Sequence, residues 1–264
     1  MYNFAYHRPS ALADAQALLA SRAEARLLAG GQTLIPTLKQ RLARPSDLVD
    51  LSRIAELKGI KVQGDAVVVG AMTLHADVAA SAEVARAIPA LAELAGLIGD
   101  AQVRNRGTLG GSVANADPAA DYPAAVVGLG ATVHTNKRAI AADDFFKGLF
   151  ETALAGDEII TSISFPVPTK AAYEKFPNPA SRYATAGVFV AQTKGGVRVA
   201  VTGAGPSVFR VSAMEGALAK SFAAKALDGI AVPARGLNDD LHASAEYRAH
   251  LVGVLARRAV ERLA

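Results

Sequence analysis

The spacing of apolar residues predicts short strands alternating with helices in the first part of the chain. Leucines and alanines spaced by three and four form one apolar helical face over residues 12–19. Residues 26–29, of which the last three are apolar, predict a buried strand, and leucines spaced by four predict a second helix over residues 34–42. Residues 48–51 predict another strand. We therefore expect a β-α-β lobe over residues 1–54.

Residues 55–168 predict a second lobe that combines a small sheet with helices. Gly64-Asp65 separates two β-branched runs and predicts a hairpin. The other predicted elements are helices at residues 87–98 and directly after Asp121, and strands at residues 131–135, 138–141 and 158–165. Pro166 and Pro168 mark the end of this lobe.

Residues 169–264 predict a third lobe. Two β-branched runs, residues 187–193 and 197–202, flank Lys194-Gly195-Gly196 and predict an antiparallel hairpin. Helical spacing predicts two helices, at residues 211–220 and 244–263. The whole pattern predicts an α+β fold.

Composition limits the classes of function. Of 264 residues, 51% are hydrophobic and 20% are charged, which is typical of a globular protein and not of a disordered one. The net charge of +4 is small, and no Lys/Arg run is interleaved with aromatic residues, so we expect no nucleic-acid partner. No apolar run approaches the ~20 residues of a membrane helix, and the first residues lack the features of a signal peptide. We expect a cytoplasmic protein.

The residue types needed for several kinds of catalytic centre are missing. The chain has no cysteine, so thiolate-ligated iron–sulfur clusters, disulfides and a cysteinyl flavin link are excluded, and a cluster has to sit on another chain. The five histidines show no metal-ligand spacing such as HExxH, so no metal site is predicted. No Ser/His/Asp or paired-carboxylate arrangement stands out, so no catalytic residue is predicted.

Two glycine pairs carry the strongest local signal. Gly110-Gly111 lies in QVRNRGTLGGSVANADPAADYP, residues 102–123, a segment that reads as too irregular for an ordinary helix or strand. Gly30-Gly31 lies in AGGQT, residues 29–33, between a predicted strand and a predicted helix start. Glycine lets a ligand approach the main chain, so a glycine pair beside a threonine fits a phosphate-binding turn. Either pair alone also fits a plain tight turn, whereas two pairs in different lobes fit an extended diphosphate ligand.

Four motifs, which follow one another along the chain, resemble motifs of one protein family. They are AGGQT, the 102–123 segment, GDEIITSISFPVP at residues 156–168 and YEKFPNPASRYATAG at residues 173–187. They are similar to the FAD-binding medium subunit of molybdenum hydroxylases, the relatives of carbon monoxide dehydrogenase and xanthine dehydrogenase. The resemblance covers nearly the whole chain. It implies a two-lobed FAD-binding domain of the PCMH type, followed by a C-terminal domain with a three-stranded antiparallel sheet and helices.

The resemblance also implies which residues bind FAD. The backbone that holds the diphosphate is expected at Ala29, Gly30, Gly31, Gln32 and Thr33 and at Thr108, Leu109, Gly110 and Gly111. The expected contacts to the polar length of the cofactor are Ser112, Asn115 and Asp121, and those near the flavin ring are Ile98, Ile160, Lys175 and Tyr183. Judged by residue type alone, the isoleucines are ordinary core residues and Asp121 is a helix cap. The chain departs from residues common in the family at Gln32, Ser112 and Pro177-Asn178.

The implied function is electron transfer within a complex of three different subunits. Non-covalently bound FAD on this chain is expected to take electrons from [2Fe-2S] clusters of a small subunit and pass them to an external acceptor. Substrate oxidation is expected at a molybdenum cofactor on a large subunit, and the resemblance implies a dimer of heterotrimers. Two alternatives stay open: a self-sufficient flavin reductase or oxidase, and a cofactor-less scaffold of the same fold.

Overall fold

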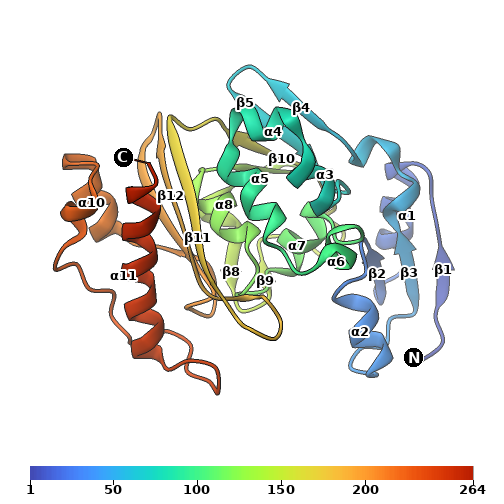
Figure 1. Cartoon of the computed structure of the whole chain (residues 1–264). Helices are drawn as coiled ribbons and strands as arrows, with labels where there is room; N and C mark the ends of the chain where they lie inside the picture. The colour runs from blue at the N-terminus through green and yellow to red at the C-terminus, as the bar shows by residue number, and fades with distance from the viewer. Residues whose placement is uncertain (264) are drawn as a thin grey trace.

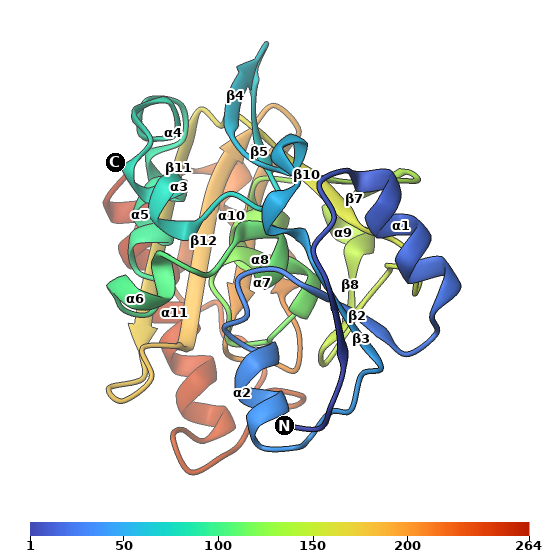
Figure 2. The same ribbon diagram turned by 90° about the vertical axis from the view of Figure 1, so that its right-hand side faces the viewer.

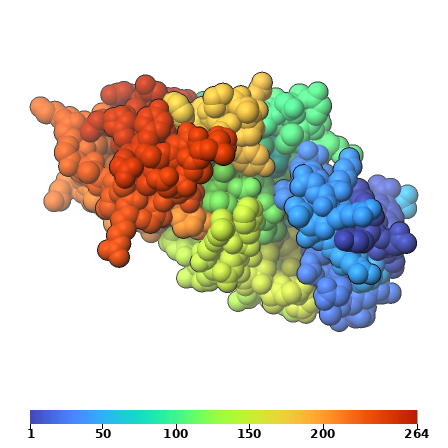
Figure 3. All heavy atoms as spheres, turned by 90° about the horizontal axis from the view of Figure 1, so that it is seen from below, coloured from blue at the N-terminus to red at the C-terminus, as the bar shows by residue number. Residues whose placement is uncertain are grey.

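The structure, a computed structural model, describes residues 1–263. The N-terminal, middle and C-terminal parts of the chain follow one another along an elongated molecule (Figure 1), and Figure 3 shows the same succession on the surface. Among the described residues, no helix has the length and apolar content needed to cross a bilayer.

The N-terminal part is a parallel three-stranded sheet in the order β1-β3-β2. Its elements are β1 (Ala5–His7), α1 (Leu12–Ser21), β2 (Ala25–Leu28), α2 (Leu34–Lys39) and β3 (Asp47–Asp50), followed by the 3-10 helices η1 (Leu51–Arg53) and η2 (Ala55–Leu57). The predicted β-α-β pattern is confirmed. The additional strand β1 is three residues long, which is too short to produce a recognisable period.

The middle part contains a five-stranded antiparallel sheet in the order β4-β5-β10-β6-β7. Its strands are β4 (Ile60–Gln63), β5 (Ala66–Gly70), β6 (Thr132–Thr135), β7 (Ala139–Ala141) and β10 (Ile160–Pro166). Its helices are α3 (His75–Ala80), α4 (Ala82–Ala87), α5 (Pro89–Gly96), α6 (Ala101–Arg104), α7 (Leu109–Asn115), α8 (Tyr122–Gly128) and α9 (Ala142–Phe145). A small hairpin of β8 (Phe146–Gly148) and β9 (Glu151–Thr152) completes it.

The glycine-rich segment is more regular than we predicted. Gly110 and Gly111 lie in the first turn of helix α7, and the Thr108 side chain caps this helix by accepting a hydrogen bond from the Gly111 N–H at 3.2 Å. A Cβ on Gly110 would come within 2.5 Å of the Ala71 Cβ. The glycine therefore serves helix packing, which a pattern of turn residues does not reveal.

The C-terminal part contains a four-stranded sheet, so the expected count of three strands was wrong. The order is β11 (Lys170–Pro177), β12 (Ala184–Thr193), β13 (Gly196–Thr202) and β14 (Phe209–Arg210), all antiparallel. The fourth strand has only two residues, and side-chain alternation cannot show in so short a run. The predicted hairpin of β12 and β13 is confirmed.

Both faces of this sheet are covered. Helices α10 (Ser212–Lys220) and α11 (Ala245–Glu261) pack on one face, while α5 and α8 of the middle part pack on the other (Figure 1). This explains why the first eight residues of β12 are all buried and apolar or small, without alternation. The 3-10 helix η3 (Ala224–Leu227) packs beside α10 and α11. Tyr173 and Phe189 join the hydrophobic core of the middle part, so the sheet is firmly attached to it.

Candidate functional site

A cavity of about 730 Å³ lies where the N-terminal and middle parts meet. Most of the residues expected at the FAD site line it: Ala29, Gly30, Gly31, Gln32, Thr33, Ile98, Thr108, Gly110, Gly111, Ser112, Asn115, Asp121, Ile160 and Tyr183. Leu109 and Lys175 are not among the lining residues, because Leu109 is in the hydrophobic core and Lys175 is buried behind Asp121. The volume of the cavity is within the range of ligand-binding pockets.

The two glycine motifs touch each other at this cavity, although they are some 80 residues apart in the chain. A Cβ on Gly30 would come within 2.2 Å of the Arg106 carbonyl oxygen, and one on Gly111 within 3.2 Å of the Ala29 Cβ. The first distance is shorter than any real contact allows. The absence of side chains therefore permits the close approach of the β2–α2 loop to the start of α7.

The backbone donors free to meet a ligand come from the first motif. Within residues 1–263, the N–H groups of residues 30–33 have no hydrogen-bond partner, and Gly31 adopts a left-handed φ of 74°. Residues 30–33 all line the cavity, so a ligand bound there can accept hydrogen bonds from these N–H groups.

The second motif has its own donors occupied. The N–H groups of Leu109 and Gly110 donate to the carbonyl oxygens of Thr73 at 3.0 Å and Ala71 at 2.8 Å. Those of Gly111 and Ser112 donate to the side chain and the carbonyl oxygen of Thr108. This motif therefore contributes a backbone surface without side chains to the cavity. Residues 30–33, in contrast, contribute free N–H donors.

Asp121 forms a buried ion pair at the cavity wall. It is 4% exposed, and its carboxylate accepts hydrogen bonds from the Tyr173 hydroxyl at 2.5 Å and the Lys175 ammonium at 2.9 Å. Burial raises the pKa of Asp121, while Lys175 and Tyr173 oppose that rise. The prediction that Asp121 caps α8 was wrong: it occupies the N-cap position, but within the described chain its side chain makes no capping bond. Both partners lie on β11, so the C-terminal part completes this wall.

One edge of the cavity is formed by residues 181–183, the end of the β11–β12 connection. Tyr183 is 46% exposed, and partial burial together with the charges of Asp117 and Asp121 raises the pKa of its phenol. Burial likewise raises the pKa of Asp117. Arg182 adopts a φ of 62°, which is unusual for a residue with a side chain. Asp117 and Arg182 were not predicted as site residues.

His75 is another lining residue that sequence reasoning missed. It is 4% exposed, burial lowers the pKa of its imidazole to about 4, and among residues 1–263 its Nδ1 finds no hydrogen-bond partner. A Cβ on Gly107 would meet its Nε2 at 2.5 Å, so the neutral ring packs directly behind the second glycine motif. A single histidine without ligand spacing gives no signal that could have identified this position.

Glu158 anchors the loop before β10, where it lines the cavity. Its carboxylate accepts hydrogen bonds from Arg138 Nε and Nη2, both at 3.0 Å, from Thr135 at 2.7 Å and from the Ala155 N–H at 3.0 Å. These donors, the Arg138 guanidinium first, lower its pKa from 4.5 to about 2.

We expect Glu158→Gln to destabilise the protein by about 1–3 kcal/mol at pH 7, because charged hydrogen bonds are replaced by neutral ones. A carboxylate whose pKa is lower in the folded state stabilises above its unfolded pKa, so the wild type should lose this contribution as pH falls from about 5 toward 2. Urea unfolding at several pH values measures both effects. The exposed Glu261→Gln serves as control. Equal pH profiles for wild type and Glu158→Gln would contradict the prediction.

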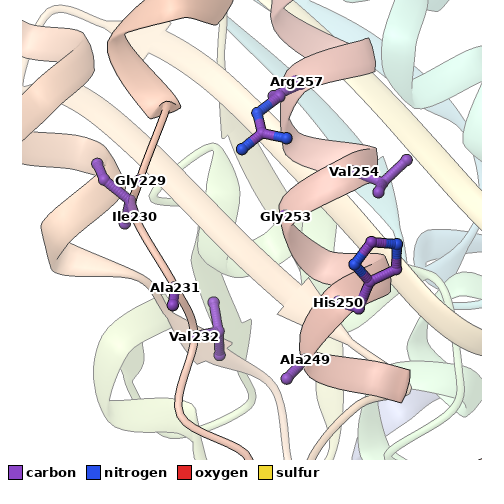
Figure 4. Close-up of a pocket in the computed structure, with 9 residues that line it drawn as sticks. All are labelled: Gly229, Ile230, Ala231, Val232, Ala249, His250, Gly253, Val254 and Arg257. Carbon is purple, nitrogen blue, oxygen red and sulfur yellow. The ribbon is translucent and has the colours of Figure 1, made fainter. Parts of the chain in front are cut away.

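A second, smaller cavity of about 300 Å³ lies on the C-terminal part between residues 229–232 and helix α11 (Figure 4). Its walls are mainly aliphatic, with His250 and Arg257 as the ionisable side chains. None of the predicted site residues lines it. The first cavity is therefore the candidate functional site.

Comparison with known proteins gives consistent matches over this whole structure. Residues 2–168 match the family described as the FAD binding domain in molybdopterin dehydrogenase. The carbon monoxide dehydrogenase medium chain of Hydrogenophaga pseudoflava is 38% identical over 97% of this chain and 96% of its own. The nicotine 6-hydroxylase medium subunit of Paenarthrobacter nicotinovorans is 36% identical over 97% of this chain and 95% of its own.

Solved structures agree with these sequence matches. Carbon monoxide dehydrogenase from Hydrogenophaga pseudoflava superposes with a TM-score of 0.89 and 37% identity, over 99% of this chain and 97% of that chain. Quinoline 2-oxidoreductase from Pseudomonas putida 86 superposes with a TM-score of 0.90 and 30% identity, over 99% of this chain and 97% of that chain.

Proposed function

Because this chain belongs to the family of FAD-binding domains in molybdopterin dehydrogenases, and is an oxidoreductase subunit of that kind, we propose that it is the electron-transfer subunit of a heterotrimeric molybdenum hydroxylase. The proposed domains are the two halves of the FAD-binding unit, residues 1–54 and 55–168, and a C-terminal domain, residues 169–264. The first two meet at the cavity, and the third supplies Tyr183 and the partners of Asp121.

The observation that carries the proposal is the contact between the two glycine motifs beside a cavity with unpaired N–H groups. The free N–H groups of residues 30–33 suit the oxygens of a diphosphate. Gly110 and Gly111 lie opposite and have no side chains, which leaves space for the diphosphate. The chemistry of this donor set therefore fits FAD. When bound, FAD supplies one-electron and two-electron redox chemistry, and the protein supplies binding, orientation and electrostatics.

The other residues of the cavity would bind and orient the remaining parts of FAD. Ser112, Asn115 and the ion-paired Asp121 provide polar groups along the cavity wall. Ile98 and Ile160 provide apolar surface for the flavin ring, with Tyr183 at the cavity edge. Lys175 acts through Asp121, because its ammonium is bonded to that carboxylate and to the Leu97 carbonyl oxygen. Gln32 and Ser112 both line the cavity, so the departures from the family at these positions bear on FAD directly.

The oxidation of substrate is assigned to other subunits. A chain without cysteine holds no thiolate-ligated cluster, which supports a separate small subunit for the [2Fe-2S] clusters. By analogy with the family, we place the molybdenum cofactor on a large subunit. The relatives are named for different substrates: carbon monoxide, nicotine and glyceraldehyde. Their medium subunits are nevertheless all similar to this chain. Substrate choice therefore lies outside this subunit. A dimer of heterotrimers and a cytoplasmic location complete the proposal.

We expect the isolated chain to bind FAD and to lack activity on organic substrate. Purification alone should give flavin absorption bands, and purification from the native source should add molybdenum and iron in metal analysis. Flavin without either metal in the native preparation would favour a self-sufficient flavin reductase or oxidase. A chain that binds no flavin would contradict both enzyme functions.

A further inference from the structure

The C-terminal end of helix α2 carries an exposed cluster of basic and apolar side chains, here named the α2 patch: Tyr2, Lys39, Arg41, Leu42 and Arg44. The guanidinium carbons of Arg41 and Arg44 lie 5.6 and 5.3 Å from the centre of the Tyr2 ring. Both distances fit cation–π contacts. The Tyr2 ring therefore contacts both guanidinium groups and joins them into one surface cluster.

The charges of the α2 patch are not neutralised by the fold. Across residues 1–263, neither Lys39 nor Arg41 nor Arg44 forms an ion pair or a side-chain hydrogen bond. Other arginines of the same part of the chain do so: Arg8 pairs with Asp50 at 3.5 Å and Arg22 with Asp47 at 3.1 Å. Three cations without an intramolecular carboxylate are matched best by carboxylates on another molecule.

The backbone at this patch is held in a conformation that its sequence does not favour. The Arg41 N–H donates to the Leu38 carbonyl oxygen and the Leu42 N–H to that of Thr37, which together form a Schellman motif at the end of α2. The residue after the cap normally is glycine, because it needs a positive φ. Here it is Arg41, with a φ of 60°. Strain of this kind at a surface position indicates that the side chain has a function.

Leu42 is the apolar member of the α2 patch. In a Schellman motif, the residue at this position usually packs back onto the helix. Leu42 is instead 74% exposed, and Tyr2 beside it is 41% exposed. The patch thus combines tyrosine and arginine, which are enriched at interface hot spots, with one protruding aliphatic side chain.

We propose that the α2 patch is a docking surface for an acidic face of a partner subunit, with carboxylates around an apolar depression that receives Leu42. This inference rests on the proposed function, because it requires the complex. The α2 patch lies at the C-terminal end of α2 (Figure 2), and none of its five residues lines the FAD cavity. Arginine forks bind carboxylates bidentately, which makes both the charge and the geometry of such a face specific.

The test uses the complex of this chain with its iron–sulfur and molybdenum subunits, produced together. Arg41→Glu/Arg44→Glu should weaken assembly by about 100-fold, because like charges then face each other across the interface. Leu42→Asn should weaken it by about tenfold. The exposed Arg86→Gln and Val62→Asn are matched controls and should assemble within about twofold of wild type. The flavin content of each variant shows that its fold is intact.

Arg41→Gly separates docking from folding. Glycine relieves the strain of the positive φ, so this variant should have a Tm about 2–4 °C higher than wild type. The same variant should assemble more weakly, by about tenfold. If the wild-type complex forms and all patch variants form it equally well, the docking proposal alone is overturned. If the wild-type chain keeps its flavin but retains no other subunit, the proposed complex itself is overturned, and the docking surface with it.

Discussion

Gly30→Ala is expected to lower the affinity for FAD by about 100-fold, which corresponds to about 2.7 kcal/mol. The added Cβ would lie within 2.2 Å of the Arg106 carbonyl oxygen and 2.7 Å of the Gly107 Cα. Both are backbone atoms, so no side-chain rotation relieves the clash, and the β2–α2 loop has to move away from the second glycine motif. This displaces the free N–H groups of residues 30–33 from the position in which they meet the diphosphate. Fluorescence titration of the apoprotein with FAD measures the effect.

The matched control for this prediction is Gly216→Ala in helix α10. Within the described structure, a Cβ at Gly216 has no neighbour within 4 Å, and its φ is not positive. FAD affinity should stay unchanged, and the free energy of unfolding should rise by about 0.5–1 kcal/mol, because alanine is the better helix former. Full FAD affinity in a correctly folded Gly30→Ala protein would show that the β2–α2 loop is not part of the FAD site.

Lys175→Met is expected to lower the free energy of unfolding by about 3–5 kcal/mol at pH 7. The ion pair between Lys175 and Asp121 is buried, with both side chains at most 5% exposed. Removal of the ammonium leaves the Asp121 carboxylate in the protein interior with the Tyr173 hydroxyl as its remaining side-chain donor. A loss of this size is a large part of the free energy of unfolding of a typical domain, so the variant should unfold at a clearly lower urea concentration.

Two further variants identify the cause of that loss. Asp121→Asn/Lys175→Met should recover part of the stability, because no unpaired charge stays buried. Lys194→Met, which breaks the exposed ion pair with Asp65, should cost only about 0–1 kcal/mol. Equal losses for Lys175→Met and Lys194→Met would contradict the assignment of a buried pair.

The pH dependence of Lys175→Met has a definite sign. Burial raises the pKa of Asp121, and without the ammonium nothing comparable opposes that rise. A carboxyl group with a raised pKa in the folded state costs nothing at low pH, where it is protonated both folded and unfolded, and becomes destabilising as pH rises above its unfolded value of about 3.9. The stability deficit of the variant should therefore shrink on acidification. A deficit that grows on acidification would contradict this explanation.

Local patterns were sufficient for some elements and not for others. The β2–α2 loop was predicted correctly because an apolar run, a glycine pair and a leucine repeat follow each other within 17 residues. The β12–β13 hairpin was equally clear, since Gly195-Gly196 separates two β-branched runs. Helix α7 was missed for the opposite reason. Its glycines suggested a turn, while the features that make it a helix are the Thr108 cap and the close packing of Gly110 on Ala71.

The sequence by itself determined the α+β class, the two glycine motifs and the absence of thiolate ligands, because each depends on residue identity and short-range spacing. Tertiary structure alone decided that the two motifs touch, that Asp121 pairs with Lys175 instead of capping α8, and that His75 packs behind Gly107. These contacts join residues far apart in the chain. Their energy comes from burial and close approach, which periodicity does not encode, so only the folded arrangement reveals which donors are left free for a ligand.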